Sequence, residues 1–358
     1  MASLSERWIN RRNRILSNPK FQHFLARFPL TRGVTRARAR QMFTFVTGFV
    51  YSQILSACFE LKLLDMLRDG ALTVDDIAAR AALPRDAALT LLKAAASLGL
   101  TESLADGRYA LGQDGAALLG NPSIAEMIAH HAVLYADLAD PVALLRRGGG
   151  AGALSAFWPY AKDSPETAGR YSTLMAATQP MVAQQVLDVV SFTGSRKLLD
   201  IGGGEGVFVS EVGKRWPSLS LSMIDLPAVA DRGRAHLGER ATVYGGSFLD
   251  PLPGDADVMS LIRIVHDHDD DVVAALLTNI KQCLPSGGKL IIAEPMADTA
   301  SARAMGHGYF GMYLLAMGSG RPRTARELQI MLHSAGFRRS YEVKTNTPLT
   351  CRVIIAET

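Results

Sequence analysis

The chain has 358 residues, of which 48% are hydrophobic and 20% charged, a composition typical of a globular protein with room for two domains and sizeable cores. Its three cysteines, Cys58, Cys283 and Cys351, lie far apart and form no CxxC pair, which argues against a disulfide framework and a cysteine-ligated zinc site. Residues 1–20 lack the apolar segment that signal peptides carry, so we expect a cytoplasmic protein.

The net charge of +4 is unevenly distributed along the chain. Residues 1–40 contain ten Lys and Arg but one acid, Glu6, so the remainder has a net charge of −5. Such a basic arm on a mildly acidic body favours an anionic partner. Apolar residues between the cations, among them Trp8, Phe24 and Phe28, give an amphipathic pattern that favours contact with a membrane surface. Packing of the arm against a second copy of the chain is the alternative.

The apolar stretch over residues 42–64 is interrupted by polar side chains, among them Thr44, Gln53 and Glu60. A membrane-spanning helix needs about 20 predominantly apolar residues in succession. We therefore expect a well-packed pair of helices here rather than a membrane span.

Residues 71–120 have the pattern of a small winged-helix unit. Thr73 can cap a first helix, Pro84 can open a second, and an Asp-Gly turn precedes a candidate wing strand. A helix that recognises DNA presents polar and basic side chains to the groove, but the helix after Pro84 has no cations besides Arg85 and Lys93. We therefore expect a dimerisation domain and no nucleic-acid partner.

The glycine-rich residues 148–152 mark a flexible turn between domains. We expect three parts: a basic amphipathic arm over residues 1–40, the winged-helix-like dimerisation domain over residues 41–150, and a catalytic domain over residues 151–358.

From residue 197 onward, strand-like and helical segments alternate, which predicts a parallel sheet with helices on both faces. The chain closes with two further strand-like runs separated by Asn346, Thr347 and Pro348, which predict a hairpin that adds an antiparallel strand. The expected fold class is therefore α/β, with strands at residues 197–201, 219–224, 241–244, 258–264, 289–293, 340–343 and 351–356.

A glycine-rich turn follows the first of these strands. Gly202, Gly204 and Gly206 form a GxGxG sequence, which lets the backbone turn tightly and approach a ligand where a Cβ atom would clash. Asp225 ends the second strand, and a carboxylate there can accept hydrogen bonds from both ribose hydroxyls of an adenosine. A nicotinamide-binding domain also carries an acid near this position and is the alternative.

Two features favour S-adenosyl-L-methionine over a dinucleotide. The spacing is GxGxG rather than GxGxxG, and an acid, Asp200, stands directly before the loop. An anionic strand end repels a pyrophosphate but attracts the sulfonium and ammonium charges of S-adenosylmethionine. A glycine turn with a purely structural role is the remaining alternative.

His266 follows the fourth strand and Glu294 ends the fifth. Ligands of open parallel sheets bind at the carboxyl ends of the strands, so both side chains are expected where chemistry occurs. A histidine that donates one ring N–H to a carboxylate is held in one tautomer and can accept a proton at the other nitrogen. We therefore predict that His266 is a general base and that Glu294 orients it.

The same segment has the pattern His-x-His-x-Asp-Asp, which also occurs in binuclear metal sites. Such a site needs further histidine ligands downstream, and the remaining candidates, His307 and His333, fall on helical stretches. We therefore predict no metal. For His268 and the aspartates after Asp267 we expect a capping role at the next helix.

These motifs together resemble the small-molecule O-methyltransferases of plant phenolic and bacterial pathways, from about residue 45 to the C-terminus. The resemblance implies a Rossmann-like class I methyltransferase domain with a seven-stranded, mostly parallel sheet, an N-terminal winged-helix dimerisation domain and a homodimer. The matching residues are 200–206, 225–227, 246–253, 266–267, 287–289, 294, 323–324 and 335–337.

The resemblance also implies roles for single residues. S-adenosyl-L-methionine would contact the loop at Asp200, Gly202, Gly203 and Gly204, and Asp225 would hold its ribose. Ser247 and Phe248 would flank its adenine, and Arg263 would lie near its amino-acid end. His266 would be the base.

Two positions depart from the family pattern. Ser247 replaces the usual aspartate, so the contact to the adenine is expected to be weaker or different. Pro322 stands where a second glutamate often supports the histidine, so His266 is expected to have one carboxylate partner rather than two.

A narrower resemblance, carried by residues 28–32, 36–40, 48–53, 266–270 and 320–324, is to the hydroxyneurosporene and demethylspheroidene O-methyltransferases of purple photosynthetic bacteria. It implies a tertiary hydroxyl of an acyclic carotenoid as the acceptor, which would fit a membrane-docking arm. Candidate acceptor-lining residues are Met175, Phe310, Met312 and Tyr313, although methionine and aromatic residues at helical spacing are also common in plain cores.

Three alternatives stay open at this point. The acceptor could be a phenolic or polyketide secondary metabolite. A winged-helix regulator could bind S-adenosylmethionine as an effector, although the cation-poor helix after Pro84 disfavours it. The same fold and cofactor could also serve C-methylation, for which His266 would be dispensable.

Overall fold

The computed structural model describes residues 3–157, 178–300, 302–347 and 351–358. The chain divides into two compact units, Met1–Gly120 and Asn121–Thr358. We expected a division near residue 150. The structure assigns residues 121–150 to the second unit because α8 (Pro122–Leu138) and α9 (Pro141–Arg146) pack with α15 (Gly311–Met317) around Leu144 and Leu314.

The first unit begins with three helices, α1 (Leu4–Leu16), α2 (Pro19–Arg27) and α3 (Arg32–Glu60). Ser3 caps α1 and Asn18 caps α2 through side-chain oxygens that accept backbone N–H groups.

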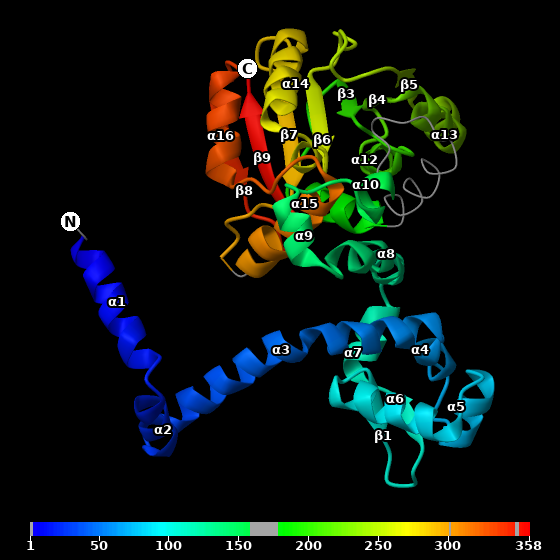
Figure 1. The fold of residues 1–358 in the computed structure, drawn as a ribbon. Helices are drawn as coiled ribbons and strands as arrows, with labels where there is room; N and C mark the ends of the chain where they lie inside the picture. Colours follow the sequence, from blue (N-terminus) through cyan, green and yellow to red (C-terminus); the bar gives the residue numbers. More distant parts are fainter. Residues whose placement is uncertain (1–2, 158–177, 301, 348–350) are drawn as a thin grey trace. The chain divides into compact units, whose positions relative to one another are not determined.

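The predicted pair of well-packed helices over residues 42–64 is wrong. α3 runs unbroken to Glu60 (Figure 1), and its apolar side chains between Met42 and Val50 are largely exposed, because no other described residue covers them. Within the described residues, α3 is also the one helix whose length and mean hydropathy of 1.4 would allow a membrane span.

The rest of the first unit confirms the winged-helix pattern. Thr73 and Asp76 form a reciprocal capping box at α5, α6 starts after Pro84, and β1 pairs antiparallel with β2 as a wing. Ala88, Leu92 and Ala95 of α6 are buried in the core of this unit. The elements are α4 (Leu63–Met66), α5 (Val74–Arg80), α6 (Arg85–Ser97), β1 (Thr101–Ser103), β2 (Tyr109–Leu111) and α7 (Gln113–Leu119).

The second unit is built on a seven-stranded sheet with the order β5-β4-β3-β6-β7-β9-β8. The first five of these run parallel, and β9 and β8 are antiparallel additions, as predicted. The strands are β3 (Lys197–Ile201), β4 (Ser220–Asp225), β5 (Thr242–Gly245), β6 (Val258–Ile262), β7 (Lys289–Glu294), β8 (Arg339–Val343) and β9 (Arg352–Glu357).

Helices cover both faces of this sheet (Figure 1). On one face, Leu276 of α14 and Leu328 of α16 pack on strand residues such as Ile292. On the other, Phe208 of α12 and Val186, which precedes β3, pack on strand residues such as Leu198. All five residues of β6 are buried, as expected for a central strand covered on both faces. These helices are α12 (Val207–Arg215), α13 (Pro227–Leu237), α14 (Asp270–Cys283) and α16 (Ala325–Ser334).

The sheet places two chemically rich segments side by side. Strand order reverses between β3 and β6, which are hydrogen-bonded neighbours, and ligands of open α/β sheets bind at such a switch point. The glycine loop follows β3, and the 3₁₀ turn η2 (Val265–Asp267) follows β6. We predicted that the latter strand extends to residue 264. It ends at Ile262 because Arg263 adopts a left-handed backbone conformation with φ of 61°.

Candidate active site

The loop after β3 has the backbone conformation that its glycines predict. Gly202, Gly204 and Gly206 have φ of 71°, 58° and 81°, a region that favours glycine. A Cβ atom on Gly202 would lie 2.4 Å from Cδ1 of Ile264, whereas no described heavy atom lies within 4 Å of the Cβ position on Gly204. The loop is therefore packed at its base and open at its tip, where a ligand can approach the backbone.

Asp225 lies directly beside this tip. Its Oδ2 accepts a hydrogen bond from the backbone N–H of Gly204 at 2.8 Å, and its Oδ1 accepts one from Leu226 at 2.7 Å. Burial raises the pKa of the Asp225 carboxyl, while these two N–H groups favour its charged form. Each oxygen retains a lone pair, so the carboxylate can still accept hydroxyl donors from a ligand.

Asp200 lies deeper than we expected. It is 1% exposed and its Oδ1 accepts a hydrogen bond from the hydroxyl of Ser260 at 2.5 Å. Burial raises the pKa of Asp200 to about 7, the Ser260 hydrogen bond opposes this shift, and the nearby Asp225 adds to it. Asp200 is thus a buried and only partly ionised group beneath the loop, and its contact with a cofactor stays a prediction.

Three further predicted cofactor residues border the same edge of the sheet. Ser247 follows β5, where the N–H of Gly246 donates to the carbonyl of Asp225 at 2.9 Å. The ring of Phe248 lies edge-on to His268, with the ring centroids 5.1 Å apart. Arg263 donates from Nη1 to the hydroxyl of Thr178 at 2.7 Å.

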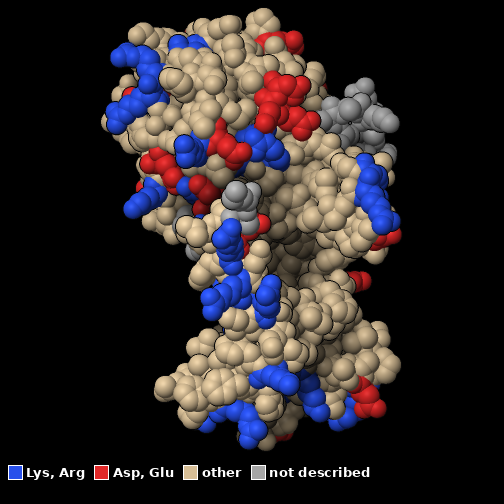
Figure 2. Space-filling model, turned by 60° about the vertical axis from the view of Figure 1, so that its left-hand side comes forward, with Lys and Arg blue, Asp and Glu red and all other residues tan. Residues whose placement is uncertain are grey.

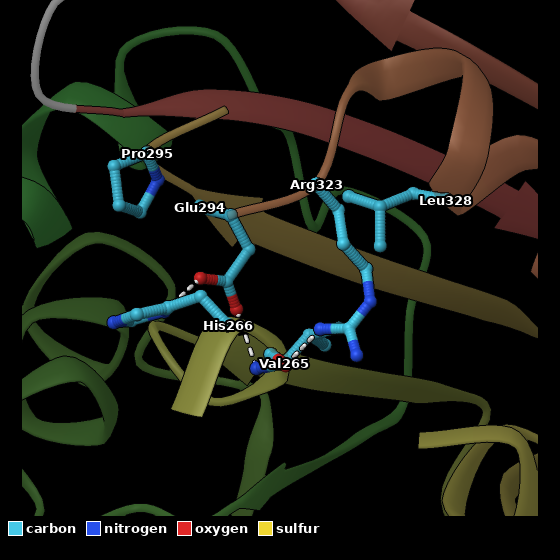
Figure 3. Close-up of a pocket in the computed structure, with 6 residues that line it drawn as sticks. All are labelled: Val265, His266, Glu294, Pro295, Arg323 and Leu328. Carbon is cyan, nitrogen blue, oxygen red and sulfur yellow. Dashed lines mark hydrogen bonds and ion pairs between the residues drawn. The ribbon is translucent and has the colours of Figure 1, made fainter. Parts of the chain in front are cut away.

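The structure brings His266 and Glu294 into direct contact (Figure 3). Nδ1 of His266 is hydrogen-bonded to Oε2 of Glu294. The other carboxylate oxygen, Oε1, accepts the backbone N–H groups of Ile264 at 2.9 Å and Val265 at 2.7 Å. Glu294 is 2% exposed, so these three donors replace water around its charge. The carboxylate fixes both the imidazole ring and the turn that carries it.

Asp267 provides a second carboxylate contact that we did not expect. Its Oδ1 lies 3.0 Å from Nε2 of His266. The expectation of a single carboxylate, drawn from Pro322, is therefore wrong, because the second carboxylate comes from the neighbouring residue in the turn. Burial disfavours the charged imidazole, but Asp267 and Glu294 outweigh it and raise the pKa of His266 to about 10. In this arrangement the ring is protonated at neutral pH.

Arg323 holds the same turn from the opposite side, a role that sequence reasoning missed. Its guanidinium donates to the carbonyl of Val265 at 2.7 Å, to the carbonyl of His268 at 2.8 Å and to the carboxylate of Asp270. Arg323 is 2% exposed. The motif around residues 320–324 pointed to this segment, but not to what its arginine binds.

Gly320 allows the chain to pass close to the same turn. It has φ of 74°, and a Cβ atom there would lie 2.2 Å from the carbonyl oxygen of His266. The neighbouring Arg321 N–H donates to that oxygen at 3.0 Å. The turn that carries His266 borders a narrow pocket lined by Val265, His266, Glu294, Pro295, Arg323 and Leu328 (Figure 3).

One of the predicted acceptor residues lies against the histidine. The rings of Phe310 and His266 are 5.9 Å apart, centroid to centroid, and nearly perpendicular at 76°. Tyr313 is buried and the partly buried Met312 packs beside it on α15, and their contact with an acceptor stays a prediction. Met175 lies outside the described residues.

Two histidine–tyrosine contacts brace the helix that carries Phe310. Nε2 of His130 lies 2.7 Å from the hydroxyl of Tyr313, and Nε2 of His131 lies 2.8 Å from the hydroxyl of Tyr309. Burial lowers the pKa of His130 to about 4 and lowers that of His131, so both rings are neutral at pH 7. Tyr309 and Phe310 end a π-helical segment, η3 (Ala304–Phe310), a form often found at functional sites.

The sequence and the fold of this chain are similar to those of known methyltransferases. Residues 135–338 match the model of an O-methyltransferase domain, and residues 43–121 match that of an O-methyltransferase dimerisation domain. The chain is 39% identical to demethylspheroidene O-methyltransferase of Cereibacter sphaeroides, over 90% of this chain and 88% of the relative. It is 38% identical to the enzyme of that name from Rhodobacter capsulatus, over 98% and 90%. Human N-acetylserotonin methyltransferase, solved in complex with S-adenosylmethionine, has the same fold, with a TM-score of 0.76 at 23% identity over 90% of this chain and 97% of that one.

Proposed function

The chain belongs to the O-methyltransferase family that carries a dimerisation domain, and on this premise we propose that it transfers a methyl group from S-adenosylmethionine to the tertiary hydroxyl of an acyclic hydroxycarotenoid. The observation that carries the proposal is the identity of 38–39%, over most of both chains, to two relatives named demethylspheroidene O-methyltransferase. The predicted resemblance to such enzymes rests on separate motifs, at residues 28–32 and 320–324 among others.

The residues around the loop after β3 fit the cofactor. S-adenosylmethionine, when bound, supplies an electrophilic methyl group on a positively charged sulfur. The open side of Gly204 leaves space for an adenosine, and Asp225 beside it has lone pairs for the ribose hydroxyls. Gly202 and Gly203 would line the loop, Ser247 and Phe248 would flank the adenine, and Arg263 would bind the carboxylate of the amino-acid end.

His266 is the proposed general base. A tertiary alcohol is a far weaker acid than a phenol, so Nε2 of His266 takes the hydroxyl proton while the oxygen gains its methyl group rather than beforehand. Before this step, Nε2 must release its own proton to solvent and lose its contact with Asp267. Glu294 keeps Nδ1 protonated and stabilises the imidazolium that forms. General-base assistance of this kind contributes about 10²–10⁴-fold to the rate.

The proposed enzyme is a homodimer that works in the cytoplasm at the membrane face. The match of residues 43–121 to a dimerisation domain supports the dimer. In α3, Phe43, Phe45 and Phe49 are exposed within that matched region and would contact the second copy. A polyene acceptor dissolves in the bilayer, so an enzyme that binds it must reach that surface.

The test is incubation of the purified chain with labelled S-adenosylmethionine and a panel of hydroxylated carotenoids and phenols, followed by chromatography. The proposal predicts a labelled methyl ether of the acyclic tertiary hydroxycarotenoid and little label in the phenols. Preferential labelling of a phenol would contradict the proposed acceptor but support S-adenosylmethionine as the cofactor. Tight binding of a dinucleotide, with no binding of S-adenosylmethionine, would contradict the proposal as a whole.

A further inference from the structure

The N-terminal arm, residues 3–40, exposes an unusual amount of apolar surface. Of the twenty-one large hydrophobic side chains that are exposed among the described residues, nine lie in the arm, between Leu4 and Val34. None of the residues of α1 or α2 is buried. Large apolar patches on a soluble protein mark sites of contact with another surface.

The apolar side chains of the arm gather on one face of each helix. On α1, Leu4, Trp8 and Ile15 are spaced four and seven residues apart, so they share one side of the helix; they are 85%, 62% and 43% exposed. Phe24 of α2 and Phe28, which directly follows this helix, stack with ring centroids 5.5 Å apart and are both exposed. Aromatic and aliphatic side chains on one face are typical of helices that lie in a membrane interface.

Cations accompany this apolar face throughout. All ten Lys and Arg of residues 1–40 are exposed, against a single acid, Glu6. The guanidinium of Arg12 lies over the ring of Trp8, 5.1 Å from its centroid. Figure 2 shows Lys and Arg side chains spread over the surface, some beside Asp and Glu and others among uncharged residues. A nucleic acid would satisfy the cations but leave the apolar side chains in water, whereas an anionic bilayer satisfies both.

We propose that α1 and α2 form a docking surface for an anionic phospholipid bilayer, with Leu4, Trp8, Ile15, Phe24 and Phe28 inserted among the acyl chains and the arginines held at the phosphate level. This inference deepens the proposed function, because it brings the enzyme to the phase in which a polyene acceptor dissolves. It rests on the arm alone and is independent of which alcohol is methylated.

The first experiment is flotation of the full chain with two kinds of vesicle. One contains phosphatidylcholine alone, and the other contains phosphatidylcholine with about 30% of the anionic lipid phosphatidylglycerol. We expect binding to the anionic vesicles that weakens as salt is raised, because exposed charges are screened. The triple variant Arg7→Gln, Arg11→Gln, Arg14→Gln should bind on the order of a hundredfold more weakly, at roughly fivefold per cation. The matched control, Lys93→Gln, Arg326→Gln, Arg338→Gln, removes the same charge outside the arm and should bind like the parent.

The second experiment separates lipid from a second copy as the occupant. Trp8 emission, taken as the difference between the parent and Trp8→Phe, should shift to the blue only when anionic vesicles are added. An emission already blue-shifted without lipid, together with loss of the dimer on deletion of residues 1–31, would overturn the proposal in favour of packing between copies. Equal binding of the two triple variants would also overturn it.

A further readout keeps the docking surface and the proposed reaction apart. Cofactor binding, and turnover of a detergent-dispersed acceptor, should be equal in the parent and the arm variant, while turnover of a vesicle-embedded acceptor should fall in the variant alone. Failure of the reaction with intact vesicle binding would count against the proposed acceptor and not against the docking surface.

Discussion

Oδ1 of Asp267 lies 3.0 Å from Nε2 of His266, the ring nitrogen opposite the one that Glu294 holds. A histidine between two carboxylates is stabilised as a cation, which accounts for its raised pKa of about 10. The nitrogen that would accept the substrate's proton is thus occupied before an acceptor binds. In the proposed reaction, Asp267 would have to release this nitrogen before His266 could accept a proton.

Replacing Asp267 by Asn should lower the pKa of His266, because one of the two charges that raise it is removed. For the parent, kcat/KM should still be rising with pH through the alkaline range, since the free enzyme must lose the His266 proton. In Asp267→Asn this rise should shift to lower pH. The control Asp271→Asn removes an exposed carboxylate of the same segment and should leave the profile unchanged. A profile that is the same in all three proteins would contradict this role of Asp267.

The buried Asp200 should make stability depend on pH. Its pKa is raised in the folded state to about 7, above the unfolded value of about 3.9, so the folded state binds more protons between these values. This contribution to the free energy of unfolding is therefore greatest at acidic pH and is lost as pH rises from about 4 to 7. Urea unfolding at pH 5 and pH 8 should show Asp200→Asn gaining stability relative to the parent as pH rises. The control Asp271→Asn, at an exposed position, should show no such gain.

Gly202→Ala should damage both the loop and the fold. The added Cβ atom would lie 2.4 Å from Ile264, at a φ of 71° that alanine disfavours, and we expect a loss of about 1–3 kcal/mol in the free energy of unfolding. Calorimetry should show weakened binding of S-adenosylmethionine. Gly254→Ala is the matched control, because no described heavy atom lies within 4 Å of its Cβ position. Normal cofactor affinity in Gly202→Ala would mean that the loop does not hold the cofactor.

Arg323→Met should loosen the turn that carries His266. The side chain keeps its apolar volume but leaves the carbonyls of Val265 and His268 without their charged donor, which should cost about 2–3 kcal/mol. Turnover should fall together with stability, because the turn no longer holds the imidazole of His266 in position. Arg326→Met, an exposed replacement on the next helix, should change neither thermal unfolding nor turnover. Unaltered unfolding of Arg323→Met would show that the guanidinium does not support the turn.

The sequence was most informative about the sheet. β6 and the centre of β7 are mostly apolar, as strands covered on both faces must be, and β9 follows the turn residues before it. The end of β6 was less predictable, because Arg263 has a left-handed backbone conformation although it is not a glycine. α3 was misjudged because its scattered polar residues suggested a break, whereas a 29-residue helix tolerates them on exposed faces.

The candidate site was predictable only where its partners end neighbouring strands. Glu294 ends β7 and His266 follows the parallel neighbour β6, so their contact could be foreseen. The contact of Asp267 with the same ring depends on how Arg323 and Gly320 fix the turn from more than 50 residues away in the sequence. The contact between His131 and Tyr309 joins residues still farther apart. Tertiary packing decides such contacts, and no local pattern records them.

The role of His266 is tested most directly by comparing His266→Ala with the parent in two assays on the same samples: turnover of the hydroxycarotenoid and calorimetric binding of S-adenosylmethionine. We predict that turnover falls by about 10²–10⁴-fold while the affinity for the cofactor stays unchanged, and that His333→Ala, an exposed histidine on α16, alters neither. Turnover at the parent's rate in His266→Ala would contradict the assignment of His266 as the base.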